Sequence, residues 1–113
     1  MSESQLRKGA LELVILGLLG TRPSYGGEIL TRLSEEADLT VSSGTVYPLL
    51  ARLRKTRLVA TSWQESPVGP PRKIYALTSA GRARLEELTT EWNVLAAAVQ
   101  RATALRRSNH GDQ

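Results

Sequence analysis

Residues 64–71 constrain the fold of this chain more than any other segment, because they include three prolines and one glycine. Such residues interrupt helices and strands, so this segment can only be a loop. The flanking segments 58–63 and 72–77 contain β-branched, aromatic and aliphatic side chains and are predicted to be strands. Together they predict a β-hairpin with a long tip, in which Trp63, at the end of a strand, is expected to face the core.

Two helices are expected in the first third of the chain. The first, over about residues 5–20, is apolar almost all round and should be buried on more than one side. The second covers about residues 25–36, with Ser24 as its candidate N-cap. Gly26 and Gly27 lower the stability of this helix and indicate close approach of another backbone.

A third helix should begin near Gly44 or Thr45, because the proline at position 48 is tolerated only in the first turn. Apolar residues at helical spacing form a face that can pack on a core: Val46, Leu49, Leu50 and Leu53. The opposite face has hydroxyl groups near its start and cations further along: Thr45, Pro48, Arg52 and Lys55. Such a face suits a groove lined with phosphates, although an ordinary solvated helix surface is the alternative.

A fourth helix, capped by Thr78, is expected over residues 79 to about 106. Its apolar residues alternate at spacings of three and four, as in the seam of a coiled coil: Leu85, Leu88, Trp92, Leu95, Val99 and Ala102. So small a domain has little surface of its own to bury this seam. A second copy of the chain is therefore the expected partner, with the first helix packed beside the seam, and folding back onto its own domain is the alternative.

This order of elements predicts a mainly α protein with one β-hairpin, a winged helix-turn-helix followed by a long dimerisation helix. The expected parts are a DNA-binding domain (residues 1–78), a C-terminal dimerisation helix (79–107) and a disordered tail (108–113). The charge distribution agrees, because residues 42–84 contain eight cations and a single acid, Glu65, in a chain of formal net charge +4. A positive middle indicates a polyanionic partner.

The composition also indicates a compartment. The chain has no cysteine, which rules out disulfides and thiolate metal sites and fits a reducing cytosol. The first residues lack the features of a signal peptide. The longest apolar stretch, residues 11–19, is too short for a membrane span and is interrupted by Glu12. A cytoplasmic location, no membrane contact and no cofactor are therefore expected.

Three segments resemble, in order and spacing, the signature blocks of PadR-type transcriptional regulators: residues 25–29 (Tyr-Gly-Gly-Glu-Ile), 43–53 and 69–81. The resemblance covers roughly residues 5–81, and the single helix beyond is similar to that of the smaller PadR subfamily. Gly27 stands where an aromatic is frequent in the family, and Val46 where leucine is frequent. The resemblance implies a homodimeric winged-helix repressor that binds palindromic operators and responds to small molecules.

The third helix is expected to enter the major groove, and the hairpin, as the wing, to reach the backbone or the minor groove. The candidate DNA-binding residues are Ser24, Tyr25, Ser42, Ser43, Thr45, Tyr47, Arg52, Lys55, Arg72 and Lys73. Some have simpler alternatives. Ser24 could only cap a helix, Tyr47 could be a half-buried packing residue, and the two hairpin cations could be a solvated strand edge.

Trp92 lies in the middle of the seam, where a two-fold axis could bring it near its symmetry mate. Two facing indoles can leave a flat apolar slot, and the resemblance to short PadR proteins implies that planar drug-like compounds bind there. The candidate ligand-binding residues are Trp92, Leu88 and Leu13, and the candidate dimerisation residues are Leu6, Leu13, Leu85, Leu88, Trp92, Leu95 and Val99. The alternative is that Trp92 simply fills a dimer core.

Catalysis is not expected. The only histidine, His110, lies in the predicted tail, and Glu86 and Glu87 are adjacent, so they point to different faces of a helix. The sequence predicts a sequence-specific DNA-binding transcriptional regulator, a ligand-responsive repressor that acts as a homodimer on a palindromic operator. Its partners would be double-stranded DNA, a second copy of the chain and a planar hydrophobic effector. A coiled-coil adaptor, or a hydrophobic-ligand sensor with secondary DNA binding, is the alternative.

Overall fold

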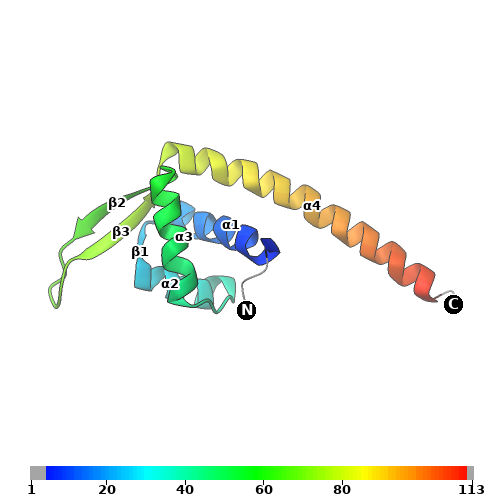
Figure 1. The fold of residues 1–113 in the computed structure, drawn as a ribbon, viewed down its shortest axis with the longest axis horizontal. Helices are drawn as coiled ribbons and strands as arrows, with labels where there is room; N and C mark the ends of the chain where they lie inside the picture. Colours follow the sequence, from blue (N-terminus) through cyan, green and yellow to red (C-terminus); the bar gives the residue numbers. More distant parts are fainter. Residues whose placement is uncertain (1–4, 112–113) are drawn as a thin grey trace.

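Three helices precede a β-hairpin and a long fourth helix follows it, as the sequence predicts (Figure 1). The computed structural model describes residues 5–111, and the side chains of residues 5–107. The elements are α1 (Gln5–Thr21), β1 (Ser24–Tyr25), α2 (Gly26–Ala37), α3 (Ser43–Lys55), β2 (Val59–Gln64), β3 (Arg72–Leu77) and α4 (Ser79–Gly111). The chain is therefore mainly helical, with a small antiparallel sheet.

The core lies where α1, α2, α3 and the sheet meet. α1 contacts α2, β3 and α4, which confirms that this helix is buried on more than one side. The buried residues are Leu11, Ile15, Leu16, Leu19, Ile29, Leu33, Val46, Leu50, Leu53, Val59 and Tyr75. Each fully buried leucine, isoleucine or valine side chain stabilises the fold by about 1.5–3 kcal/mol relative to an exposed one.

The sheet has three strands in the order β1-β3-β2, all antiparallel. The hairpin of β2 and β3 is confirmed, with Val59 opposite Leu77 and Gln64 opposite Arg72. The two-residue strand β1 is an addition to the predicted elements. It is too short to have a periodicity in sequence, and it exists only because β3, about fifty residues later, pairs with it.

The start of α2 differs in two ways from the prediction. Tyr25, not Ser24, is the N-cap residue. A Cβ at position 26 would lie 2.4 Å from the ring of Tyr47, so Gly26 makes room for an aromatic side chain of α3 rather than for another backbone. At position 27 the nearest ring is that of Tyr25 itself. The glycine pair thus serves the packing of two tyrosines.

α3 begins at Ser43, slightly earlier than predicted, and this places Pro48 in its second turn. Proline has no amide hydrogen to donate to the carbonyl of Gly44. Both residues are exposed, so water can satisfy that carbonyl. The prediction that Pro48 must lie in the first turn was therefore wrong because the missing hydrogen bond faces solvent.

α4 is capped by Thr78, as expected, since the amide of Gly81 donates a hydrogen bond to Thr78 Oγ1 at 3.0 Å. The helix continues to Gly111, past its predicted end near residue 106. Residues 108–111, predicted as disordered, are thus helical, and residues 112–113 lie outside the described part. The first turns of α4 pack beside α1, and the rest projects away from the body (Figure 1), giving extents of 65 × 28 × 24 Å.

Candidate nucleic-acid interface

α3 has one buried and one exposed face, as the sequence predicts. Val46, Leu50 and Leu53 are buried in the core. Five of the six predicted DNA contacts in residues 42–55 are exposed: Ser42, Ser43, Tyr47, Arg52 and Lys55. Thr45 is half-buried, with its Oγ1 3.2 Å from Ser42 Oγ. Hydroxyl groups therefore gather at the N-terminus of α3, where free backbone amides and the helix dipole favour an anion.

Arg52 has a second role that its position in sequence does not reveal. Its Nη2 donates to Oε1 of Glu12 in α1, and the two residues are forty positions apart. This ion pair ties α3 to α1 and offsets part of the positive charge of Arg52. Arg54 and Lys55 make no ion pair with any described residue, so their charge is fully available to a polyanion.

Tyr47 combines the two roles that the sequence left open. Its ring lies against Gly26 at the start of α2, which makes it a packing residue between two helices. It is nevertheless 43% exposed. Part of its side chain is therefore available to a ligand on the outer face of α3.

Ser24 does not fit its predicted role as a phosphate-binding residue. It is only 1% exposed, and its Oγ accepts a hydrogen bond from Nη1 of Arg32 at 2.9 Å. Its backbone pairs with Tyr75 in the sheet. A buried hydroxyl with a partner cannot reach a phosphate, and the correction follows from the strand β1 that the sequence did not indicate.

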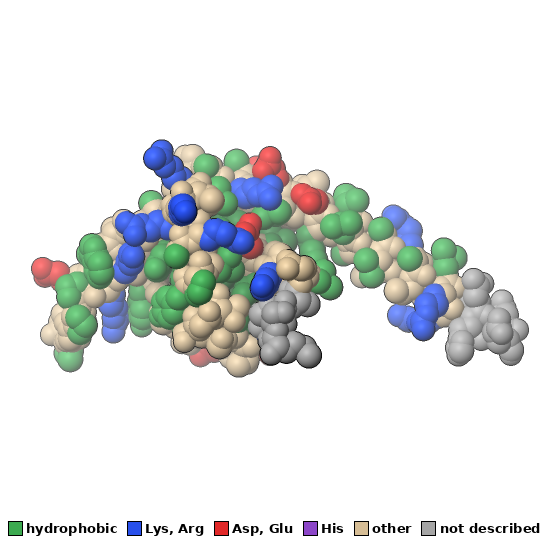
Figure 2. Space-filling view, in the orientation of Figure 1, with side chains coloured by type: hydrophobic (Ala, Val, Ile, Leu, Met, Phe, Trp, Pro, Cys, Tyr) green, Lys and Arg blue, Asp and Glu red, His purple; other side chains and the backbone are tan. Residues whose placement is uncertain are grey.

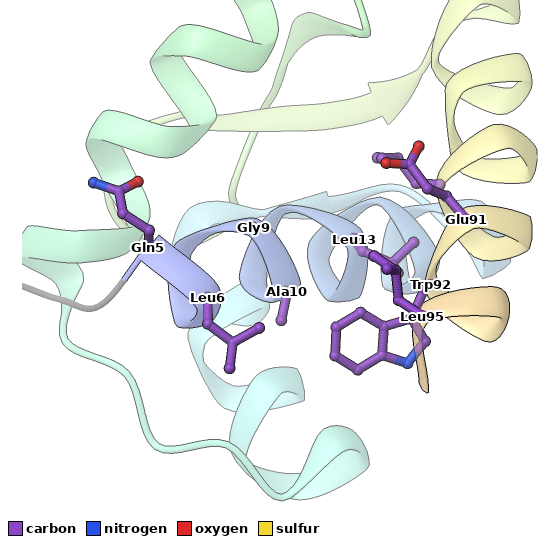
Figure 3. Close-up of a pocket in the computed structure, with 9 residues that line it drawn as sticks. Gln5, Leu6, Gly9, Ala10, Leu13, Glu91, Trp92 and Leu95 are labelled. Atoms are coloured by element: carbon purple, nitrogen blue, oxygen red, sulfur yellow. The ribbon is translucent and has the colours of Figure 1, made fainter. Parts of the chain in front are cut away.

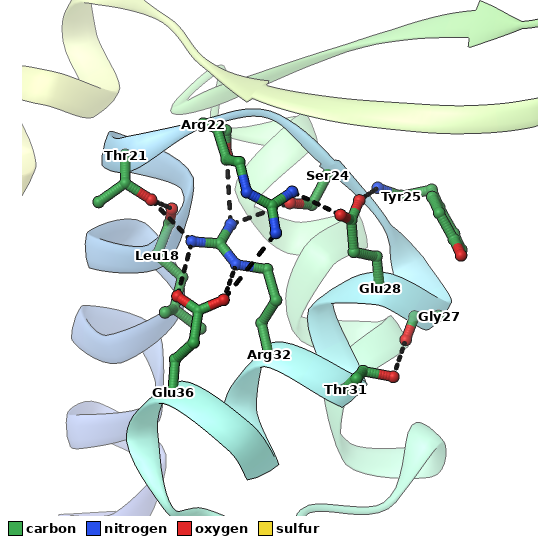
Figure 4. A network of polar contacts seen from close by, with 10 residues as sticks. All are labelled: Leu18, Thr21, Arg22, Ser24, Tyr25, Gly27, Glu28, Thr31, Arg32 and Glu36. Atoms are coloured by element: carbon green, nitrogen blue, oxygen red, sulfur yellow. Dashed lines mark hydrogen bonds and ion pairs between the residues drawn. The ribbon is translucent and has the colours of Figure 1, made fainter.

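Arg32 is the buried charge that sequence reasoning missed. Its guanidinium donates to both carboxylate oxygens of Glu36, to Thr21 Oγ1 at 2.7 Å, to Ser24 and to the carbonyl of Arg22 (Figure 4). Beside it, Arg22 pairs with Glu28, which also accepts from the amide of Tyr25. The network fixes the start of α2 against the end of α1.

Acid is expected to weaken this network. The hydrogen bond from Arg22 lowers the pKa of Glu28, and the hydrogen bond from Arg32 lowers the pKa of Glu36. Carboxyl groups with a lowered pKa stabilise the fold above their unfolded pKa, near 4.5, and this contribution disappears as the pH falls through the folded pKa. The melting temperature should therefore drop between about pH 5 and pH 3, and less steeply in a Glu28→Gln, Glu36→Gln double variant.

The matched control for this measurement is Glu35→Gln. Glu35 is exposed on the same helix and forms no ion pair with a described residue. Its substitution should leave the acid slope of the melting temperature unchanged. An identical slope in the double variant and the unaltered protein would contradict the assignment.

The wing presents its two cations on opposite faces of the hairpin. The guanidinium carbon of Arg72 lies 4.4 Å from the centre of the Tyr25 ring, an arrangement that holds the charge in place. Lys73 Nζ lies 6.0 Å from the centre of the Tyr75 ring. Tyr25 therefore contacts a cation of the wing, besides being a candidate DNA contact itself.

The prediction that Trp63 is a core residue was wrong. This side chain is 71% exposed on β2, near the loop end of the hairpin. The hairpin extends beyond the body of the domain (Figure 1), so no helix reaches the end of the strand. Figure 2 shows Lys and Arg side chains beside hydrophobic ones along this hairpin.

An apolar groove of about 220 Å³ lies between α1 and α4 (Figure 3). It is lined by Gln5, Leu6, Gly9, Ala10, Leu13, Leu88, Glu91, Trp92 and Leu95. The structure therefore brings together all three candidate ligand-binding residues, Trp92, Leu88 and Leu13. Trp92 remains 41% exposed and Leu95 55% exposed.

Two of the predicted dimerisation residues lie outside this groove. Leu85 is half-buried and packs against the core of its own domain, close to Gly20. Val99 is exposed further along α4. The first turns of α4 thus fold back onto their own domain, and only the later turns leave their apolar seam open.

Residues 5–107, whose side chains the structure describes, include no group of three or more His, Cys, Asp or Glu that could hold a metal ion. No helix among them is long and apolar enough to cross a membrane.

The three helices, the basic outer face of α3 and the cationic hairpin define a winged helix-turn-helix DNA-binding protein. Residues 15–87 match the model of the transcriptional regulator PadR-like family, and this match spans more than half of the chain. The chain therefore belongs to the PadR-like family of transcriptional regulators. Members of this family are regulators of transcription rather than enzymes, which supports the expectation of no catalysis.

Solved structures agree with this assignment. A PadR-like transcription factor from Bacteroides fragilis is 45% identical, with a TM-score of 0.75, over 86% of this chain and 93% of that one. A PadR-like transcriptional regulator from Bacillus cereus is 37% identical, with a TM-score of 0.76, over 87% and 95%. An uncharacterised protein of Lysinibacillus sphaericus is 32% identical over 94 residues, 81% of this chain and 86% of that protein.

Proposed function

We propose that this regulator is a repressor that binds a palindromic operator as a homodimer and is released by a planar hydrophobic small molecule. The observation that carries the proposal is the open groove between α1 and α4, whose apolar residues Leu6, Trp92 and Leu95 are largely exposed. A contiguous apolar surface on a soluble domain marks a site for a partner or a ligand.

A second copy of the chain fits this surface best. The open seam continues along α4 from Trp92 through Leu95 to Val99 at coiled-coil spacing, where α4 has left its own domain. α1 supplies Leu6 and Leu13 from the other side of the groove. A two-fold pairing in which each α4 packs beside the partner's α1 and α4 would cover both sets of residues.

DNA would be read by the two α3 helices of such a dimer. The proposed contacts are the exposed or half-buried polar residues of α3 and of the wing: Ser42, Ser43, Thr45, Tyr47, Arg54, Lys55, Arg72 and Lys73. Arg52 would contribute less than a free cation, because it is paired with Glu12. Simultaneous insertion requires the two helices to be about 34 Å apart, one turn of DNA.

The effector site would lie at the same interface. A groove of about 220 Å³ is small for a drug-sized molecule, which needs at least about 300 Å³. Two grooves that face each other across a two-fold axis would supply the missing volume, with the Trp92 indole from each copy as an apolar wall. A flat compound between the indoles would change the spacing of the two domains and hence of the two α3 helices.

DNA binding is tested by a salt series. The purified protein should bind a duplex with a strongly negative slope of log affinity against log salt, and Lys55→Ala should reduce the magnitude of that slope by about one. Arg101→Ala, an exposed cation far along α4, is the matched control and should leave the slope unchanged. Selection from a pool of genomic fragments should then return a palindrome.

The salt series also separates the proposed function from its rival. A chain that dimerises and binds no duplex even at low salt would be a coiled-coil adaptor. A chain that binds all duplexes equally would contradict the palindromic operator.

A further inference from the structure

Trp63 is the most exposed aromatic side chain in the described part of the chain, and nothing in the fold uses it. Side chains alternate between the two faces of a strand, so Val59, Thr61 and Trp63 share one face of β2. Their partners on β3 are Leu77, Tyr75 and Lys73, which share the same face. Val59 and Tyr75 are buried in the core, so Trp63 and Lys73 lie on the core-facing side of the hairpin, beyond the edge of the core.

The hairpin adjoins α3, because that helix contacts β2, the strand that carries Trp63. Burial raises the pKa of the Tyr75 hydroxyl, and the neighbouring Tyr47 raises it further, whereas Arg54 acts in the opposite direction. Tyr47 and Arg54 both belong to α3, which agrees with the contact between α3 and β2. Lys73 and Trp63 therefore lie on the face of the hairpin whose inner part, with Val59 and Tyr75, is buried against the core.

The charged residues near Trp63 indicate the chemistry of its partner. Lys73 is the cross-strand neighbour of Trp63, and its Nζ lies 6.0 Å from the centre of the Tyr75 ring. The nearest acid in sequence is Glu65, in the loop after β2, and it is the only acid among residues 42–84. An indole beside an ammonium group suits the sugar-phosphate backbone of DNA, where the ring covers deoxyribose carbons and the ammonium pairs with a phosphate.

Building on the DNA-binding function proposed above, we propose that Trp63 is a DNA contact of the wing. Its indole packs against a deoxyribose beside the phosphate bound by Lys73. Trp63 would then anchor the hairpin on the backbone next to the groove that α3 enters. Because this contact does not read bases, it would strengthen binding to any duplex and would set the position of the wing.

The affinity test uses a duplex of random sequence, about 30 base pairs long, at low salt. Trp63→Ala should bind about 5- to 10-fold more weakly than the unaltered protein, and Trp63→Phe, which keeps an aromatic ring, should recover most of the loss. Val94→Ala is the matched control, because Val94 is similarly exposed but lies on α4 outside the groove. Its affinity should be unchanged.

A spectroscopic test locates the contact. The chain has two tryptophans, so 5-fluorotryptophan labelling should give two fluorine resonances, which Trp63→Phe assigns. Addition of the duplex should shift the Trp63 resonance.

The outcomes are distinct. If the protein binds the duplex but Trp63→Ala has unchanged affinity, or if the Trp63 resonance does not move, the wing contact is refuted and the DNA-binding function stands. If Trp63→Ala alters only self-association, Trp63 belongs to a protein interface and the proposal is again refuted. If the unaltered protein binds no duplex, the proposed function itself fails.

Discussion

Gly81→Ala is expected to lower the free energy of unfolding by about 3 kcal/mol, the size of an overpacked core site. A Cβ at this buried position would lie 2.0 Å from the carbonyl oxygen of Leu58 and 3.1 Å from Cδ2 of Leu77. The carbonyl cannot simply move away. It accepts hydrogen bonds from the amide and from Oγ1 of Thr78, both at 3.1 Å, and these bonds hold the start of α4.

The consequences would extend to the orientation of α4. Thr78 Oγ1 also hydrogen-bonds to the carbonyl of Arg57, in the turn that follows α3. Hydrogen bonds from Thr78 to the carbonyls of Arg57 and Leu58 thus hold the start of α4 to the end of α3. A methyl group at position 81 would push these elements apart, so the variant should unfold at a lower denaturant concentration and bind DNA less well.

Gly44→Ala is the matched control for this measurement. Gly44 also lies in the first turn of a helix, and the nearest atom to a Cβ there is Ser42 Oγ at 3.8 Å, an ordinary contact. Alanine is a better helix former than glycine, so this variant should be unchanged or more stable by up to about 1 kcal/mol. Urea denaturation of both variants checks the prediction, and equal stabilities would contradict it.

The order of elements could be predicted because it depends on local patterns. The helical spacing of apolar residues in α1 and α3, the Pro- and Gly-rich loop and the capping threonine Thr78 each act within a few residues. The seam of α4 likewise predicted three of the residues that line the groove, Leu88, Trp92 and Leu95. What the spacing could not give was where α4 leaves its own domain, since that depends on the length of α1 beside it.

The errors have a common cause in contacts between distant parts of the chain. Ser24 is predicted to be a surface cap, because neither its strand pairing with β3 nor its hydrogen bond with Arg32 has a local signature in the sequence. Arg52 is predicted to contact DNA without an ion-pair partner, because its partner Glu12 lies forty residues away in the sequence. Trp63 seemed a core residue because an aromatic on a strand usually is one, and only the reach of the hairpin beyond the body exposes it.

A charge in the open seam is expected to disrupt the proposed dimer. Leu95→Glu should raise the dimer dissociation constant by about 100-fold or more, because an unpaired carboxylate buried between two α4 helices costs several kcal/mol. Leu95 is 55% exposed in the single chain, so the variant should keep its fold. Operator affinity should fall as the dimer dissociates, because two separate domains no longer bind the two half-sites as one unit.

The control is Val94→Glu, one residue earlier on the same helix, exposed and outside the groove. Analytical ultracentrifugation should show a monomer for Leu95→Glu and a dimer for Val94→Glu, with unchanged melting of the monomer domain in both. If Leu95→Glu remained a dimer of normal operator affinity, the interface would have to lie elsewhere. The groove between α1 and α4 would then be left to a small molecule alone, and Trp92→Ala should alter the response to that molecule without changing the oligomeric state.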